Sequence, residues 1–302
     1  MEQKKLGTKR SRQAFYHFML LPGIIFLLIF NVLPLAGLSI AFFKYTPSKG
    51  IFNSDFVGLK YFKYLFILPD GKQIIKNTMI IAAGKMFFNT IVPITFAILL
   101  NEVRNKYLKR TVQTVAYLPH FLSWVVLAPV VLFMFGLNGP INNLITRFGS
   151  ERISFMSSND WFRTILISTE TWKEFGYASI IYLAALTSID PALYESAVID
   201  GANRWEQTWN ITLPGIKGII LLSIVMTLPN ILNAGFDQVY NLINPMVYKS
   251  GDIIDTWTYR VGLVDRQYSL STAVSLIKSV VGAILIFLAN LYVEKRSDYI
   301  IF

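Results

Sequence analysis

The chain has 302 residues, of which 54% are hydrophobic and 15% are charged, with a mean hydropathy of +0.48. This composition is too apolar for a soluble protein and indicates a membrane protein. Its lack of cysteine excludes disulfides and cysteine nucleophiles, and its two distant histidines, His17 and His120, leave no zinc signature. The net charge is +10, and the lysines and arginines are scattered between the apolar segments. This distribution is typical of loops flanking a membrane and not of a nucleic-acid-binding face.

Six apolar segments are long enough to cross the roughly 30 Å hydrocarbon core as helices. They cover residues 18–43, 78–100, 115–135, 164–189, 219–236 and 272–293. Several contain prolines, which membrane helices tolerate because neighbouring groups bond the freed carbonyls, so kinks are expected there. The first segment is too long for a signal peptide and lacks a cleavage site, so an uncleaved anchor is expected. The sequence therefore predicts an all-α polytopic protein with six transmembrane helices.

The orientation follows from the basic residues around the first segment. Five lysines and arginines precede it within residues 1–17, whereas only Lys44 and Lys49 follow it closely. The totals on the two sides of the six-helix model are nearly equal, so the flanks of the first helix carry the argument. We expect a cytoplasmic N-terminal segment (1–17), one transmembrane domain (18–293) and a cytoplasmic tail (294–302). Residues 44–77, 137–163 and 237–271 are then external, and 101–114 and 190–218 are internal.

Motifs for catalysis and nucleotide binding are missing from the sequence. A phosphate-binding loop needs GxxxxGK[ST], and the nearest segments, at Gly71-Lys72 and Gly84-Lys85, lack the upstream glycine and the hydroxyl. No GxSxG elbow occurs, and no set of metal ligands accompanies the carboxylates of the fourth segment. The sequence predicts neither an enzyme nor a cofactor site on this chain.

The segment 190–214 stands out between the fourth and fifth apolar segments. Asp190 is placed to cap a short helix that has Pro191 at its first position, and Gly201 breaks that helix. A second short helix follows and is predicted to end at Pro214. This helix-turn-helix is either an ordinary interfacial connector or a docking element, since it presents aromatic and acidic side chains that lipid packing does not require.

The same segment resembles the cytoplasmic signature of permease subunits in binding-protein-dependent ABC importers. That signature reads EAA, three residues, Gly, nine residues, then I-x-L-P. The matching positions here are Glu195, Ala197, Gly201, Ile211, Leu213 and Pro214, and Ser196 replaces the first alanine. The resemblance implies a type I ABC importer permease fold. It also implies that 190–214 is the helix that couples the permease to its ATPase, with roles for Glu195, Ser196, Ala197, Asp200 and Gly201.

Further resemblances extend over nearly the whole chain and concern the cargo. Residues 56–61, 172–174, 233–238 and 252–256 are similar to carbohydrate-uptake permeases, in particular to the branch that imports complex oligosaccharides, including fragments of plant polysaccharides. The resemblance implies a second homologous permease, two ATP-binding subunits that hold ATP and Mg, an extracellular solute-binding protein and an oligosaccharide substrate. The protein is expected in the bacterial cytoplasmic membrane.

Polar residues inside the fourth segment need an explanation, because ionisable groups are unfavourable in a membrane. Glu170, Lys173, Glu174 and Tyr177 share one helical face, and Trp172 adjoins them. They form either a sugar-binding face, with aromatic rings stacking on the sugar, or a structural stripe in which Glu170 and Lys173 neutralise each other.

A second polar stripe in and after the fifth segment consists of Asn230, Asn233 and Asp237. It is either part of the substrate pathway or a set of hydrogen bonds between helices. Lys85 and Lys278 are expected to reach the outer interface with their long side chains. Alternatively, these two lysines and Lys173 attract an anionic sugar.

Two other functional classes remain open on the residues alone. An ion-gradient-driven secondary transporter would have inverted repeats and broken helices around a midplane site. It would leave the 195–214 signature unexplained. A membrane enzyme would need a set of catalytic residues, and the sequence shows none.

Overall fold

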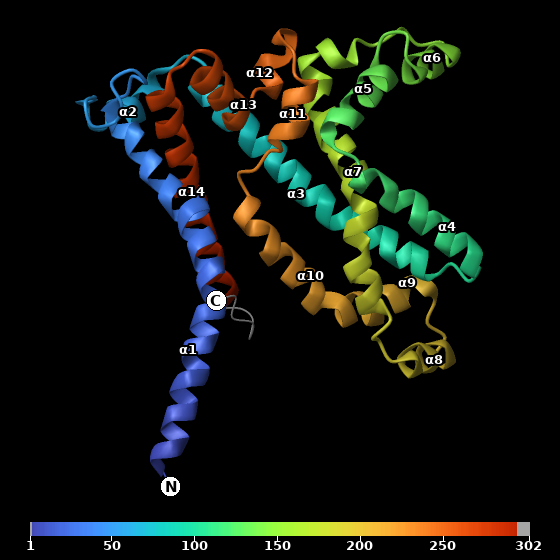
Figure 1. Cartoon of the computed structure of the whole chain (residues 1–302). Helices are drawn as coiled ribbons and strands as arrows, with labels where there is room; N and C mark the ends of the chain where they lie inside the picture. Colours follow the sequence, from blue (N-terminus) through green and yellow to red (C-terminus); the bar gives the residue numbers. More distant parts are fainter. Residues whose placement is uncertain (1, 295–302) are drawn as a thin grey trace. The chain divides into compact units, whose positions relative to one another are not determined.

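A computed structural model of the chain describes residues 2–294, which fold almost entirely into helices. The described residues separate into two compact parts. One comprises the chain up to residue 67 together with 258–277, and the other comprises 68–257 together with the chain from 278 onward. Figure 1 follows the elements along the chain.

The first part contains the helical segment that begins the chain. Its elements are α1 (Glu2–Leu27), the π-helical turn η1 (Leu28–Val32), the 3₁₀ helix η2 (Leu33–Phe42), the strands β1 (Phe43–Lys44) and β2 (Asp55–Phe56), α2 (Lys60–Ile67), the π-helical turn η8 (Arg260–Val264) and the first turns of α14 (Tyr268–Glu294). The two short strands pair antiparallel. Ser269 Oγ donates to the carbonyl of Phe43 and accepts from the amide of Tyr45, so the start of α14 is held against β1.

The second part contains most of the remaining helices. They are α3 (Gly71–Asn101), α4 (Lys106–Tyr117), η3 (Leu118–Phe121), α5 (Trp124–Phe135), α6 (Pro140–Arg147), η4 (Phe155–Ser157), α7 (Asn159–Leu186), α8 (Pro191–Ile199), α9 (Arg204–Gln207), η5 (Thr208–Thr212), α10 (Leu213–Thr227), η6 (Leu228–Asn230), α11 (Phe236–Leu242), η7 (Pro245–Val247) and α12 (Tyr248–Gly251). The division in the chain between Trp257 and Thr258 falls within helix α13 (Ile254–Tyr259).

Helices α3 and α7 form the axis of this second part and pack against each other (Figure 1). One apolar core surrounds Phe162 and Leu166 of α7 and includes residues of α3, α5 and α11. A second, smaller core joins Ala97 of α3 and Tyr182 of α7 to Ile216 of α10. Long apolar side chains on both faces of α7 therefore hold α3, α5, α10 and α11 around it.

The structure confirms that the chain forms helices long and apolar enough to span a membrane. Five segments of the described chain are long and apolar enough to span a membrane, namely Phe15–Phe42, Gly71–Asn101, Trp124–Arg147, Arg204–Thr227 and Tyr268–Leu288. A sixth is obtained if Asn159–Leu186 and the bent Pro191–Ile199 count as one. The helical content and these five to six segments agree with the predicted all-α polytopic class.

The third predicted span, 115–135, is wrong as a continuous helix. Helix α4 ends at Tyr117, a 3₁₀ turn follows, and Leu122 and Ser123 are extended before α5 begins at Trp124. Pro119 causes the break, because it has no amide hydrogen and its ring excludes the carbonyl four residues earlier. The spanning segment is instead Trp124–Arg147.

The fifth predicted span, 219–236, is displaced toward the N-terminus. The helical segment Arg204–Thr227 precedes a 3₁₀ turn and an irregular stretch, and Gly235 adopts a φ of +84° immediately before α11. A left-handed conformation interrupts a helix and favours glycine. Consequently Asn230, Asn233 and Asp237 do not form a stripe on one helix.

Candidate functional site

The predicted coupling segment begins as its sequence indicates. The side chain of Asp190 accepts a hydrogen bond from the amide of Ala192 at 2.9 Å, and Pro191 occupies the first helical position of α8. Helix α8 is bent by 75° from α7. Because a proline at this position needs no amide partner, the two residues together start a new helix directly after the bend.

The end of α8 is a Schellman motif centred on Gly201. The amide of Ala202 bonds to the carbonyl of Ala197 at 2.9 Å, and the amide of Gly201 bonds to that of Val198 at 3.1 Å. Gly201 has a φ of +80°, which is unfavourable for residues with a side chain. A Cβ at Gly201 would meet open space, so the backbone angle alone requires glycine here.

The second half of the segment differs from the prediction that Pro214 ends a short helix. Asn203 and Glu206 form a capping box at the start of α9, and the chain then stays helical through η5 into α10, which ends at Thr227. Pro214 therefore lies at the beginning of a long helix. The π-helical turn supplies the physical reason, since its wider hydrogen-bond spacing accommodates a residue without an amide donor.

The residues of the signature differ in exposure. The exposed residues are Glu195, Ser196, Asp200, Gly201 and Pro214, and the partly buried ones are Ala197, Ile211 and Leu213. Helix α8 has no buried residue, and its Ile199 side chain is 86% exposed. Of the predicted coupling residues, Glu195, Ser196 and Ala197 thus lie on α8 and Asp200 and Gly201 at its end. The other three, Ile211, Leu213 and Pro214, lie in η5 and at the start of α10.

The polar residues of α7 make two separate ion pairs, and the alternative in which Glu170 and Lys173 neutralise each other is wrong. Glu170 Oε2 lies 3.6 Å from Nζ of Lys85 on α3, while Lys173 Nζ lies 2.6 Å from Oε1 of Glu174. Lys173 also donates to the carbonyl of His120 at 3.1 Å. That carbonyl belongs to the break after α4, so the ammonium bonds an oxygen that the missing helical turn leaves free.

His120 joins the same cluster on α7, which the sequence did not reveal. Its Nδ1 lies 2.7 Å from Oε2 of Glu174, and its ring stacks on that of Tyr177 with 3.9 Å between centroids. The Tyr177 side chain remains 45% exposed. Lys173, Glu174 and Tyr177 are therefore brought together, with His120 as an unpredicted fourth member.

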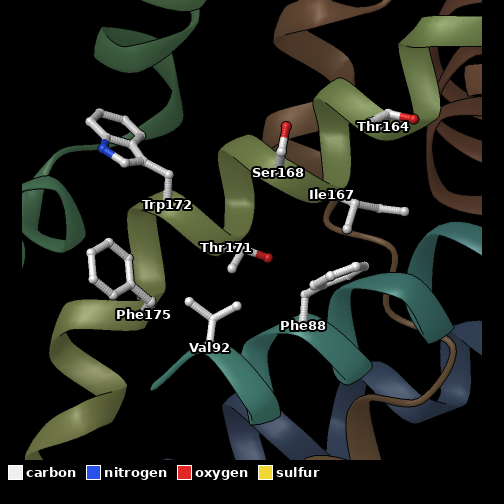
Figure 2. Close-up of a pocket in the computed structure, with 8 residues that line it drawn as sticks. All are labelled: Phe88, Val92, Thr164, Ile167, Ser168, Thr171, Trp172 and Phe175. Atoms are coloured by element: carbon white, nitrogen blue, oxygen red, sulfur yellow. The ribbon is translucent and has the colours of Figure 1, made fainter. Parts of the chain in front are cut away.

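Trp172 lies apart from that cluster, on another face of α7. It lines an apolar recess of about 540 Å³ between α3 and α7, where Phe88 and Phe175 supply two further rings (Figure 2). The hydroxyl of Thr171, which also lines the recess, is buried without a hydrogen-bond partner. The two aromatic residues predicted to stack on a sugar thus belong to different surfaces.

A polar hollow of about 190 Å³ lies between α3, α7 and the interrupted fifth span. The side chains that line it include Lys85, Asn89, Glu170, Asn230 and Asn233. Two of their oxygens, Glu170 Oε2 and Asn89 Oδ1, are buried without a hydrogen-bond partner. The hollow is therefore lined in large part by polar side chains, which suit a guest with hydroxyl groups.

Asp237 does not line this hollow. It begins the exposed side of α11, in whose first turn its carboxylate lies near the helix N-terminus. The turn at Gly235 separates it from Asn230 and Asn233. Of the predicted second stripe, the structure thus brings only the two asparagines together.

The expectation that Lys85 reaches the outer interface is also wrong, whereas that for Lys278 stays a prediction. Lys85 is only 6% exposed, and Lys278 bonds to both carboxylate oxygens of Asp255 at 2.6 and 2.7 Å. Each ammonium is held by a carboxylate inside its own part of the fold, which replaces the solvation that an interface would give. The sequence showed that these lysines lie in apolar segments and need a partner. It did not show which carboxylates pair with them, because those carboxylates lie far away in the sequence.

Comparisons with known proteins assign the chain to a family. Residues 90–298 match the model of the family described as binding-protein-dependent transport system inner membrane component. Two Bacillus subtilis (strain 168) proteins are each 42% identical to it. They are the protein LplB, with 95% of this chain and 91% of the relative covered, and the polygalacturonan/rhamnogalacturonan transport system permease protein YteP, with 98% and 93% covered.

Solved structures agree with these relatives. A chain of a bacterial ABC transporter involved in the import of the acidic polysaccharide alginate superposes with a TM-score of 0.88 at 37% identity, covering 97% of this chain and 100% of that one. A chain from the same kind of transporter, in complex with an alginate pentasaccharide-bound periplasmic protein, gives the same TM-score and identity. These matches favour an importer permease over a stand-alone secondary transporter or a membrane enzyme. The chain thus belongs to the family of inner-membrane components of binding-protein-dependent transport systems, as a multi-pass ABC importer permease subunit.

Proposed function

We propose that this permease passes an oligosaccharide, including acidic polysaccharide fragments, into the cytoplasm of a bacterium by alternating access. A second homologous permease completes the pathway, two ATPase subunits bind ATP and Mg, and an extracellular binding protein delivers the sugar. The N-terminal segment 1–17, the segment 190–214 and the tail 294–302 face the cytoplasm. Of the tail, residues 295–302 lie outside the described residues.

The projecting helix α8 carries the proposed coupling to the ATPase. A nine-residue helix with no buried residue contributes little to the internal packing of this chain, yet it is capped at both ends. Its exposed apolar side chains, Leu193, Val198 and Ile199, accompany the exposed carboxylate of Glu195. Such a surface fits a cleft with an apolar floor and a basic rim on the partner subunit.

The sugar pathway is proposed to include both polar surfaces of α7. In the hollow, Glu170 accepts hydrogen bonds from sugar hydroxyls and the amides of Asn230 and Asn233 add donors and acceptors. Tyr177 offers a ring beside the Lys173–Glu174 pair. Trp172 contributes from the separate recess, and Asp237 from the exposed side of α11.

Acidic cargo is proposed because of what the relatives carry, not because of free positive charge in the spans. YteP is named for polygalacturonan and rhamnogalacturonan, and the superposed structures concern alginate. All three intramembrane lysines considered, at 85, 173 and 278, are paired with carboxylates. Charge selection is therefore assigned to the delivery protein rather than to these lysines.

Reconstitution tests the proposed function. The permease is purified in mild detergent with the subunits that accompany it, placed in liposomes with its binding protein, and supplied with neutral and uronic oligosaccharides. Uptake that requires ATP inside the liposome and the binding protein outside is expected for at least one oligosaccharide. Uptake driven by an ion gradient without an ATPase would contradict the proposal.

A further inference from the structure

Lys85 occupies the middle of α3 and is bonded at its tip to the irregular stretch that follows α10. Its Nζ donates to the carbonyl of Ala234 at 2.6 Å and also bonds to Oε1 of Gln238. Glu170 provides the third acceptor direction, at 3.6 Å. Lys85 thus makes two hydrogen bonds to the stretch after α10 and one ion pair to α7.

The stretch that Lys85 contacts is a tight turn with its own internal hydrogen bonds. The amide of Asn233 bonds to the carbonyl of Asn230 at 2.7 Å, and the side chain of Asn233 accepts from the amide of Gly235 at 3.1 Å. A Cβ at Gly235 would lie 2.6 Å from the Lys85 ammonium. Glycine there thus permits both the left-handed backbone and the close approach of the lysine.

Gln238 extends the same connection to α7. Its Nε2 donates to the carbonyl of Leu166 and to the hydroxyl of Thr169, both at 2.8 Å, while its oxygen accepts from Lys85. Gln238 is fully buried and Thr169 nearly so. One chain of bonds therefore links α3, the turn, α11 and α7.

We propose that Lys85 is a positioning residue for cargo: by bonding the Ala234 carbonyl, it sets where the turn presents Asn230 and Asn233 to the hollow. This inference rests on the proposed function in treating those asparagines as sugar contacts. The competing explanation is that Lys85 serves only to neutralise the buried charge of Glu170.

The charge explanation and the positioning explanation make different demands on the side chain. Neutralising Glu170 requires only that the charges balance, whereas positioning requires a donor that reaches the Ala234 carbonyl. Removing both charges together keeps the balance and still leaves that carbonyl without its partner. A double variant therefore separates the two explanations.

The experiment compares Lys85→Met, the double variant Lys85→Met/Glu170→Gln and the control Lys278→Met. The control also removes a lysine from a carboxylate pair in a span, but Lys278 bonds Asp255 and not the turn. Uptake of trigalacturonate, or of whichever oligosaccharide the wild-type complex imports, is measured in liposomes as KM and Vmax. Because Glu170 lines the hollow, Glu170→Gln alone is measured as the baseline for the double variant.

The expected result is a KM raised about tenfold or more in Lys85→Met, and in the double variant relative to Glu170→Gln, with Vmax changed less. That size corresponds to the loss of one hydrogen bond from a charged donor. Lys278→Met should keep its KM within about twofold. A double variant with the KM of Glu170→Gln would overturn the proposal.

A second measurement tests the turn without cargo and remains informative if wild-type uptake fails. The chain has no native cysteine, so Ile231→Cys, which lines the hollow, introduces a single thiol. In the assembled complex, N-ethylmaleimide should modify this thiol several-fold faster when Lys85→Met or the double substitution is also present. The Lys278→Met substitution serves as the reference. Modification rates that stay unchanged in both Lys85 variants would overturn the positioning role. An absence of wild-type uptake would contradict only the proposed function.

Discussion

The phenol oxygen of Tyr194 on α8 lies 3.0 Å from Oγ1 of Thr212, the last residue of the π-helical turn before α10. Nearby, the buried side chain of Gln207 donates to the carbonyl of Ala202 at 2.9 Å. These two bonds join the projecting helix to the base of a membrane span. A displacement of α8 by an ATPase partner would therefore be transmitted directly to α10.

Tyr194→Phe is expected to weaken that connection while leaving α8 folded, because only the hydroxyl is removed. One neutral hydrogen bond contributes about 1 kcal/mol, which corresponds to roughly a fivefold shift between attached and detached α8. Substrate-stimulated ATPase activity of the complex should fall by a similar factor, while assembly persists. Thr212→Val, which removes the other hydroxyl, should give the same loss, and an unchanged stimulation in both variants would contradict this role.

Substitutions in the signature itself should uncouple ATP hydrolysis from transport. Glu195→Lys reverses an exposed charge and should abolish sugar-stimulated hydrolysis with the subunit still inserted, as expected if the partner's cleft is basic. Gly201→Val should do the same, because φ is +80° there and a β-branched residue is strongly disfavoured at such an angle. Stimulated ATPase activity and co-purification of the ATPase are measured.

The Gly201 variants have a matched control that follows from the open space around this residue. Asn tolerates the left-handed conformation better than other residues, so Gly201→Asn should retain more stimulation than Gly201→Val. Equal activity of the two variants would mean that the backbone angle is not the decisive property.

The membrane topology can be tested with single cysteines, since the chain has none of its own. Ser48, Ser150 and Ser196 are exposed, whereas Ser250 is buried and would react poorly on either side. A membrane-impermeant thiol reagent added to intact cells should label cysteines at 48 and 150 but not at 196. Labelling at 196 in sealed cells would place α8 outside and refute the proposed orientation.

Tyr177→Ala and Trp172→Ala should each reduce oligosaccharide uptake while assembly and basal ATPase activity remain. An aromatic contact contributes about 0.5–1.5 kcal/mol beyond its buried area, so a two- to tenfold change in KM is expected. The two residues lie on different surfaces, so their effects should add. Normal uptake in both variants would assign these rings to helix packing.

Lys173→Gln should impair the uptake of neutral and acidic oligosaccharides to the same degree. The ammonium of Lys173 is already bonded to Glu174 and to the carbonyl of His120, which leaves no unpaired charge to attract a uronic acid. The ratio of the two uptake rates is measured at low and physiological salt, because screening would reveal a long-range attraction. A loss confined to acidic cargo would instead assign the lysine to charge selection.

The local features of the sequence predicted much of the fold. Uncharged segments of about 20 residues determine that helices cross a membrane, because an unpaired backbone is unfavourable in lipid. Asp190, Pro191 and Gly201 predicted the start and end of α8, since capping and left-handed angles depend on a few adjacent residues. The spacing from Glu195 to Pro214 indicated the family for the same reason: it lies within one continuous segment.

The tertiary structure alone decided which charges meet and where the helices break. Glu170 and Lys173 share a helical face, yet their partners are Lys85, from another helix, and Glu174, because each ammonium also bonds a carbonyl at a break in a distant span. Sequence spacing describes one helix at a time. Partner choice depends on which freed carbonyl comes within bonding distance after α3, α7 and the interrupted spans have packed, and that distance is a property of the assembled fold.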